Sequence, residues 1–423
     1  MTRRHVAELV GDMHAWFESM RVARGYGGPV SHWWRHCRRY TGAGLDWRYE
    51  GIIHGYLNLY EATEESQWLD AAVTAGTDLI EGQLKSGNYR VSAFERNPEF
   101  GGTPHEACVS GALLRLARIR RDAEQEWQPF AQTARKNLQW HLDALWRSKN
   151  ETFSDTVGLA SYVPNKIAST VEAFLEWDQL VDGENLVDRL VEPATDTILE
   201  LQVTTGPHRG AIHQMSAPES GNSGDGKFFP LYIARCIPPL LAVGEATGAK
   251  RFTEAAVQAG EFLTTVEHED GGFPQVVYAS GDLNTYLRWI AGLGDVLRAY
   301  DVLNTRGYSF ETDAVETRLR AGYDECGAFR TAEGFGRLAG RTERQVFEDV
   351  LHVVGWNDKA FRWLTTQVDT VTGGDPSPIR TRCHFDGTAG RFIEDTDRIE
   401  FVPGGRAGRT YRWDKKSRWA EVR

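Results

Sequence analysis

The stretch FFPLYIARCIPPLLAVGEATGAKRFTEAAVQAGEFLTTV, residues 228–266, contains two helical patterns separated by a turn. In the first half, apolar residues such as Ile233, Ile237 and Leu240 recur every three or four positions, and Gly248 marks a stop. In the second half, residues 251–266 carry one apolar stripe opposite a polar face. The first helix is apolar around more of its circumference, so we expect it to be the inner helix of a hairpin.

The same plan recurs six times along the chain. The first helices of the six hairpins are expected to begin near Tyr49, Pro104, Pro164, Phe228, Leu283 and Glu343, at spacings of about 55 to 64 residues. The other predicted pairs are 50–61 with 66–83, 104–120 with 126–147, 164–180 with 185–202, 283–303 with 312–323, and 343–354 with 358–367. This repeat predicts an all-α protein, an (α/α)6 toroid of six helical hairpins. A helix over 4–21 is a candidate outer partner that closes the ring.

The connections between helices differ in length. Turns from inner to outer helices are short, whereas outer-to-inner connections run to roughly 15 to 25 residues, which is typical of loops with a function. In a closed ring the long loops share one face, at the N-terminal ends of the inner helices, which we call the mouth. From residue 369 short strand patterns replace helices, so we expect a toroid over 1–368 and a β-rich extension over 369–423 packed on it.

Composition limits the partners and the compartment. A formal net charge of −11 argues against nucleic acid, whose affinity depends on Lys and Arg neutralising phosphates. Five scattered cysteines without a CxxC pair suit a reducing compartment. No apolar segment has the length of a signal peptide or a membrane span, which favours a cytoplasmic protein with no membrane partner.

The hairpin repeat, together with the turn Asp270-Gly271-Gly272-Phe273, resembles the six-hairpin glycosidase-like superfamily, which includes unsaturated glucuronyl and rhamnogalacturonyl hydrolases. The chain also resembles a group of proteins from extreme halophiles. The resemblance implies a toroid that acts on carbohydrate. The same turn occurs in terpene cyclases and prenyltransferases built on α/α toroids, so the turn does not select the chemistry.

The segment before the first inner helix is one candidate for the site. Glycoside hydrolysis needs two carboxyl groups and favours aromatic platforms for the sugar. Asp46, Trp47, Arg48 and Glu50 supply these groups in a short span, and His54 lies one helical turn beyond Glu50. The structural alternative is that Asp46 caps the helix, Glu50 complements its dipole and Trp47 packs in the core.

The loop before the second inner helix is a further candidate. It offers Glu95, Arg96, His105 and Glu106. A capping box that begins at Thr103 would by itself explain Glu106. Capping does not explain the other three, which we expect in the cleft.

Three more positions complete the predicted site. Asp270 is a candidate acid, with a turn-forming role as the alternative; Asp282 is either a binding residue or a helix cap. Trp34 lies in the basic and aromatic stretch 32–40 and could hold an acidic sugar with its Arg neighbours. The alternative is a packed surface segment with Trp34 in the core. His32 and His36 have no further ligands at a suitable spacing, so no metal site is expected.

The leading hypothesis is a carbohydrate-active enzyme, a glycoside hydrolase on an acidic or modified oligosaccharide, with mouth carboxylates as general acid and base. Glu50, Glu95, Asp46, His105 and Asp270 are the catalytic candidates, and no cofactor is expected. A lyase or sugar epimerase that abstracts a proton with His54 or His105 and a Tyr is one alternative. A non-catalytic glycan-binding protein is the other, and the oligomeric state stays open.

Overall fold

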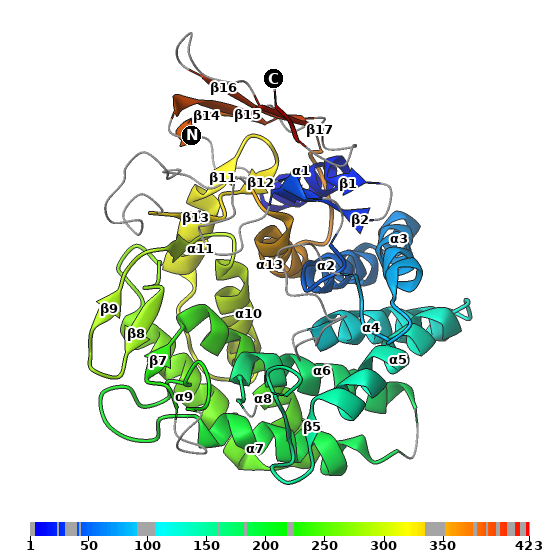
Figure 1. Cartoon of the computed structure of the whole chain (residues 1–423), viewed down its shortest axis with the longest axis vertical. Helices are drawn as coiled ribbons and strands as arrows, with labels where there is room; N and C mark the ends of the chain where they lie inside the picture. The colour runs from blue at the N-terminus through cyan, green and yellow to red at the C-terminus, as the bar shows by residue number, and fades with distance from the viewer. Residues whose placement is uncertain are drawn as a thin grey trace.

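The computed structural model shows a ring of helices with a small sheet at one side (Figure 1). It describes residues 5–22, 25–29, 40–41, 44–90, 106–158, 161–181, 184–217, 224–334, 352–374, 379–385, 388–394, 398–403, 411–414 and 420–422.

Six inner helices form the closed ring. They are α2 (Arg48–Thr63), α4 (Ala107–Asp122), α6 (Pro164–Leu180), α8 (Pro230–Thr247), α10 (Leu293–Asn304) and α13 (Val354–Leu364). Each packs against the next, and α13 returns to α2. The predicted (α/α)6 toroid is confirmed.

Six outer helices surround this ring. They are α1 (Val6–Ser19), α3 (Ser66–Gly82), α5 (Gln128–Ala144), α7 (Glu192–Glu200, preceded by the π-helical turn Val187–Val191), α9 (Lys250–Val266) and α11 (Asp313–Ala321). The N-terminal helix α1 packs on α13, so it is the outer helix of the last hairpin. The chain therefore closes its ring with its first and last helices.

Two predicted helices are wrong. The fifth inner helix begins at Leu293 and not at Leu283, because Leu283–Asn284 is strand β9, paired with β8 (Val276–Tyr278). The predicted outer helix 358–367 overlaps α13, which is an inner helix followed by a 3-10 turn, Thr365–Gln367. The inward face of α13 carries charged side chains, so its pattern resembled that of a solvent-facing helix. Most of the predicted helix 343–354 lies outside the described residues.

Short strands connect the helices, and a sheet follows them. The short pairs are β1 (Arg21–Val22) with β2 (Gly25–Tyr26), β3 (Gly28–Pro29) with β4 (Tyr40–Thr41), β5 (Trp146–Arg147) with β6 (Thr152–Phe153), β7 (Lys227–Phe228) with β8, β10 (Arg288–Trp289) with β13 (Ala332–Glu333), and β11 (Tyr323–Asp324) with β12 (Ala328–Phe329). The antiparallel sheet β14 (Ile379–Phe385), β15 (Thr388–Glu394), β16 (Arg398–Pro403), β17 (Tyr411–Asp414) and β18 (Ala420–Val422) forms the β-rich C-terminal part. The boundary at 368/369 stays a prediction.

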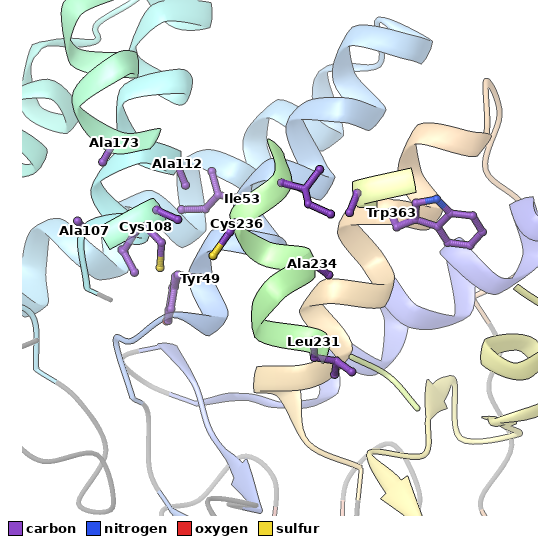
Figure 2. Packing of buried hydrophobic residues seen from close by; sticks show 14 of the residues in the cluster. Tyr49, Ile53, Ala107, Cys108, Ala112, Ala173, Leu231, Ala234, Cys236 and Trp363 are labelled. Carbon is purple, nitrogen blue, oxygen red and sulfur yellow. The ribbon is translucent and has the colours of Figure 1, made fainter. Parts of the chain in front are cut away.

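Small residues let the inner helices approach closely. A Cβ on Gly51 of α2 would lie 2.3 Å from the backbone oxygen of Asp358 in α13. Gly111 of α4 lies against Ala173 of α6, and Figure 2 shows Ala112 and Ala173 among the buried residues of these neighbouring helices. This close approach brings the inward side chains of all six helices together.

No helix in the described part of the chain is long and apolar enough to cross a membrane.

Candidate active site

Titratable side chains from all six inner helices, most of them charged, meet inside the ring. We call them the axial charge cluster. Its members are Glu50 and His54 of α2, Arg115 of α4, Glu172 of α6, Arg235 of α8, Asp295 and Arg298 of α10, and Asp358, Lys359 and Arg362 of α13. Seven of them are buried, whereas Arg115, Glu172 and Arg298 are half-buried.

Glu50 is the centre of this cluster. Its Oε2 accepts hydrogen bonds from Arg235 Nη2 at 2.6 Å and Lys359 Nζ at 3.0 Å, and its Oε1 accepts one from Arg362 Nη1 at 2.7 Å. Burial raises the pKa of Glu50, but these three cations outweigh burial and hold the pKa well below its ordinary value. Glu50 is therefore ionised, and its carboxylate suits charge stabilisation better than proton donation.

Asp358 is in the opposite protonation state. Its Oδ2 accepts hydrogen bonds from Lys359 Nζ at 2.9 Å and from the backbone N–H of Gly51 at 3.2 Å. Its buried Oδ1 has no hydrogen-bond partner among the described residues. Burial raises the pKa of Asp358 to about 8 despite the opposing effect of Lys359, so this carboxyl group is mostly protonated at neutral pH.

Lys359 bridges these two carboxyl groups. Because its Nζ lies 2.9 Å from Asp358 Oδ2 and 3.0 Å from Glu50 Oε2, the two oxygens are no more than about 6 Å apart. A protonated and an ionised carboxyl group at such a separation are the groups that acid-assisted hydrolysis of a glycoside needs.

A second layer of the cluster lies further along the inner helices. Glu172 pairs with Arg298 at 2.5 Å and with Arg362 at 3.3 Å. Arg115 donates to Nδ1 of His54 at 3.0 Å. Burial, with Arg362 and Arg115 nearby, lowers the pKa of His54 well below its ordinary value, so the imidazole is neutral. Glu50 and His54 both face the ring interior, as their spacing predicted.

Three tryptophans lie at the mouth, where three successive inner helices begin. The rings of Trp289 and Trp356 stack at 4.3 Å between centroids, and Trp47 meets Trp356 edge-on at 5.4 Å. All three are half-buried, and Lys359 Nζ lies 5.2 Å from the centroid of the Trp47 ring. This tryptophan cluster offers aromatic faces beside the cation that bridges the two carboxyl groups.

Asp46 and Arg48 pair with each other next to this cluster. Arg48 Nε and Nη2 donate to the two carboxylate oxygens of Asp46 at 2.7 and 2.9 Å, and both residues are buried. Asp46 Oδ1 also accepts the backbone N–H of Arg48 at 3.3 Å. Asp46 therefore bonds the first residue of α2, but the N-cap residue is Trp47 and not Asp46. The role of Asp46 and Arg48 in a site stays a prediction.

The structure places three other predicted residues away from the axial cluster. Asp270 accepts the N–H of Gly272 at 3.1 Å and pairs with Arg288 and, at 3.7 Å, with Arg318. Asp282 is exposed in the β8–β9 turn, so its expected helix-cap role is wrong. Glu106 is buried at the N-cap of α4, and its side chain makes no capping bond there. None of the three joins the axial charge cluster.

Four predicted residues, Trp34, Glu95, Arg96 and His105, lie outside the described residues. Within the described ranges, no group of three or more His, Cys, Asp or Glu side chains could hold a metal ion.

Most members of the cluster were not among the residues predicted from the sequence. Arg235 sits in the apolar first part of the inner helix α8, before Glu245. Asp358, Lys359 and Arg362 lie on one side of a helix that was expected outside the ring. The available signal was a charged residue within an apolar stretch. A buried charge needs a counter-charge, so Arg235 indicated an acidic partner inside the ring.

A small hollow also opens at the mouth, between the N-termini of α6 and α8. Asn165, His213, Gln214 and Tyr232 are among its lining residues, and its volume of about 10 Å³ has room for about one water molecule. His213 Nδ1 accepts the N–H of Gly226 at 3.1 Å, and burial lowers the pKa of His213. A neutral imidazole and the phenol of Tyr232 are therefore both among the groups that line this hollow.

Comparisons with known proteins agree with this architecture. No family model and no curated protein sequence matches the chain. Among solved structures, a cellobiose 2-epimerase from Bacillus thermoamylovorans B4167 matches with a TM-score of 0.64 and 11% identity over 86% of this chain and 98% of that chain. A D-mannose isomerase matches with a TM-score of 0.62 and 12% identity over 87% of this chain and 100% of that chain.

An unsaturated glucuronyl hydrolase from Bacillus sp. GL1 matches with a TM-score of 0.59 and 13% identity over 86% of this chain and 95% of that chain. At such identities the likeness shows the toroid fold alone.

Proposed function

We propose that this protein is a carbohydrate-active enzyme, a glycoside hydrolase that acts on an acidic or modified oligosaccharide at the mouth of the toroid. The observation that carries the proposal is the geometry of two carboxyl groups, Asp358 and Glu50, which Lys359 bridges at 2.9 and 3.0 Å beside the tryptophan cluster. Asp358 would protonate the leaving oxygen as the glycosidic C–O bond breaks, and Glu50 would stabilise the positive charge that develops on the sugar. Water would then form the new C–O bond and give up a proton that restores Asp358.

The cations of the cluster support an acidic substrate. Arg235, Lys359 and Arg362 converge on the single carboxylate of Glu50, so a sugar carboxylate that reaches Lys359 would meet an excess of buried positive charge. Both carboxyl groups are buried, so the proposal requires side chains over Lys359 to move when the sugar binds.

The names of several solved proteins with this fold describe enzymes that act on sugars. We propose a carbohydrate substrate by analogy with them. The kinship with halophile proteins, a cytoplasmic location and the absence of nucleic-acid and membrane partners stay predictions.

The test is an activity screen on neutral and uronic-acid oligosaccharides, followed by Asp358→Asn. We expect a rate loss of about 10²-fold or more, because the variant cannot donate the proton. Asp301→Asn is the matched control, since burial also raises the pKa of Asp301, which binds Trp363 Nε1 outside the cluster. A folded Asp358→Asn variant with wild-type activity would remove Asp358 from the mechanism.

A sugar epimerase or isomerase is the second candidate, and the neutral His213 beside Tyr232 favours it. Deuterium uptake from D2O into the sugar without new reducing ends would select this alternative. Unsaturated products that absorb ultraviolet light would indicate a lyase. Glycan binding without any turnover would indicate a binding protein.

A further inference from the structure

A groove runs along the outer helix α5, and it is larger than the hollow at the mouth. It is lined by Ser86, Gln132, Arg135, Lys136, Gln139, Trp140 and Asp143, and its volume is about 360 Å³. That volume is in the range of small-molecule sites. All lining residues except Ser86 share one face of α5, which contributes nothing to the axial charge cluster. The helix lies on the outer side of the ring (Figure 1).

Trp140 supplies a fixed aromatic wall to this groove. Its indole is half-buried and packs against the hydrophobic core, with the His141 ring edge-on at 5.2 Å. A rigid aromatic side chain of this kind offers contact area with little loss of conformational entropy on binding. Its face can stack against the C–H groups of a sugar ring.

The charges around the groove are close to balanced. Arg135 pairs with Glu184 at 3.2 Å and lies over the Trp177 ring at 5.3 Å. The positive charge of Lys136 is offset by the carboxylate of Asp143 in the same groove. A polyanion such as nucleic acid therefore finds little net attraction here.

Neutral hydrogen-bonding groups complete the lining. Gln132 and Gln139 each bring an amide that can donate and accept, and Gln139 Nε2 donates to Asp143 Oδ1 at 2.9 Å. Paired amide and carboxylate groups next to an aromatic face match the alternating hydroxyl groups and apolar face of a sugar. The polar lining gives a lipid chain little to pack against.

We propose that this α5 groove is a binding site for a short run of uncharged sugar residues, separate from the axial charge cluster. The site holds one segment of a glycan on the outer wall of the toroid. It goes beyond the proposed function, because the groove binds sugar whether or not the cluster cleaves it.

The test is calorimetric titration of the full chain with neutral tetrasaccharides, cellotetraose, maltotetraose and mannotetraose, and with a uronic-acid tetramer. We expect at least one neutral probe to bind, and Trp140→Ala to weaken that binding by roughly tenfold or more. Gln132→Ala should weaken it by a smaller factor. Trp127→Ala and Gln125→Ala, at positions outside the groove, are matched controls and should bind as wild type.

Thermal unfolding of each variant shows whether the fold is kept. If Trp140→Ala unfolds, the binding measured with Gln132→Ala decides the test. Binding that is unchanged in both groove variants, binding of the uronic-acid tetramer alone, or no binding of any probe would overturn the proposal. Oligosaccharide cleavage is measured separately. Groove-dependent binding of neutral probes with no cleavage of any acidic oligosaccharide rejects only the proposed hydrolase, and cleavage with groove-independent binding rejects only the groove.

Discussion

Replacing Glu50 with Gln tests whether the axial charge cluster holds the ring together. The variant keeps the shape of the side chain and one acceptor oxygen, but it removes the charge that three buried cations share. At an effective dielectric constant of about 20, one such contact at about 3 Å is worth about 6 kcal/mol before the cost of desolvation.

The loss is smaller than the sum of three contacts, because each cation keeps a second partner. Lys359 retains Asp358 at 2.9 Å, Arg362 retains Glu172 at 3.3 Å, and Arg235 retains Ser169 Oγ at 3.0 Å. One net positive charge is left uncompensated in a buried site. We therefore expect Glu50→Gln to lower the free energy of unfolding by about 3 to 5 kcal/mol.

Urea unfolding followed by circular dichroism measures this change, with an unchanged slope required for the comparison. Adding Lys359→Met should restore charge balance, so the double variant should be more stable than Glu50→Gln alone. Glu245→Gln is the control, since the ion pair of Glu245 with Arg306 is largely exposed. Its loss should lower the free energy of unfolding by less than about 1 kcal/mol. A loss below about 1 kcal/mol in Glu50→Gln, or strictly additive effects in the double variant, would refute the reasoning.

Three further predictions concern the ring. The pKa of Asp358 is about 8 in the folded state, whereas in the unfolded chain it is about 4. The fold therefore loses stability through this group as the pH rises from about 4 to about 8. Asp358→Asn should therefore gain stability relative to wild type between pH 5 and 8 in denaturant titrations, and a constant difference would contradict this linkage. Gly51→Ala should destabilise the fold far more than Gly111→Ala. A Cβ at Gly51 would lie 2.3 Å from a backbone oxygen, whereas a Cβ at Gly111 would lie 3.3 Å from its nearest atom. Similar melting temperatures for the two variants would contradict this prediction. Phe17→Ala should cost about 3 to 5 kcal/mol if α1 closes the ring against Phe361, whose ring lies 5.2 Å away, and a near-neutral effect by urea unfolding would count against that closure.

The sequence by itself determined the helical hairpins and their number. Apolar periodicity located α8 and α9 and placed α2, α6 and their outer partners, because burial against neighbours imposes the 3.6-residue pattern directly on the chain. It also placed Glu50 and His54 on one inward face, since residues one helical turn apart share a face.

Only the tertiary structure decided what those inward residues meet. The partners of Glu50 come from α8 and α13, at positions 185 to 312 residues away in the chain, and no local pattern encodes such contacts. The same reason explains why the pattern of α13 predicted an outer helix. Its charged residues are buried because distant helices supply their counter-charges. Closure of the ring likewise depends on α1 meeting α13, a contact between the first and last helices of the toroid.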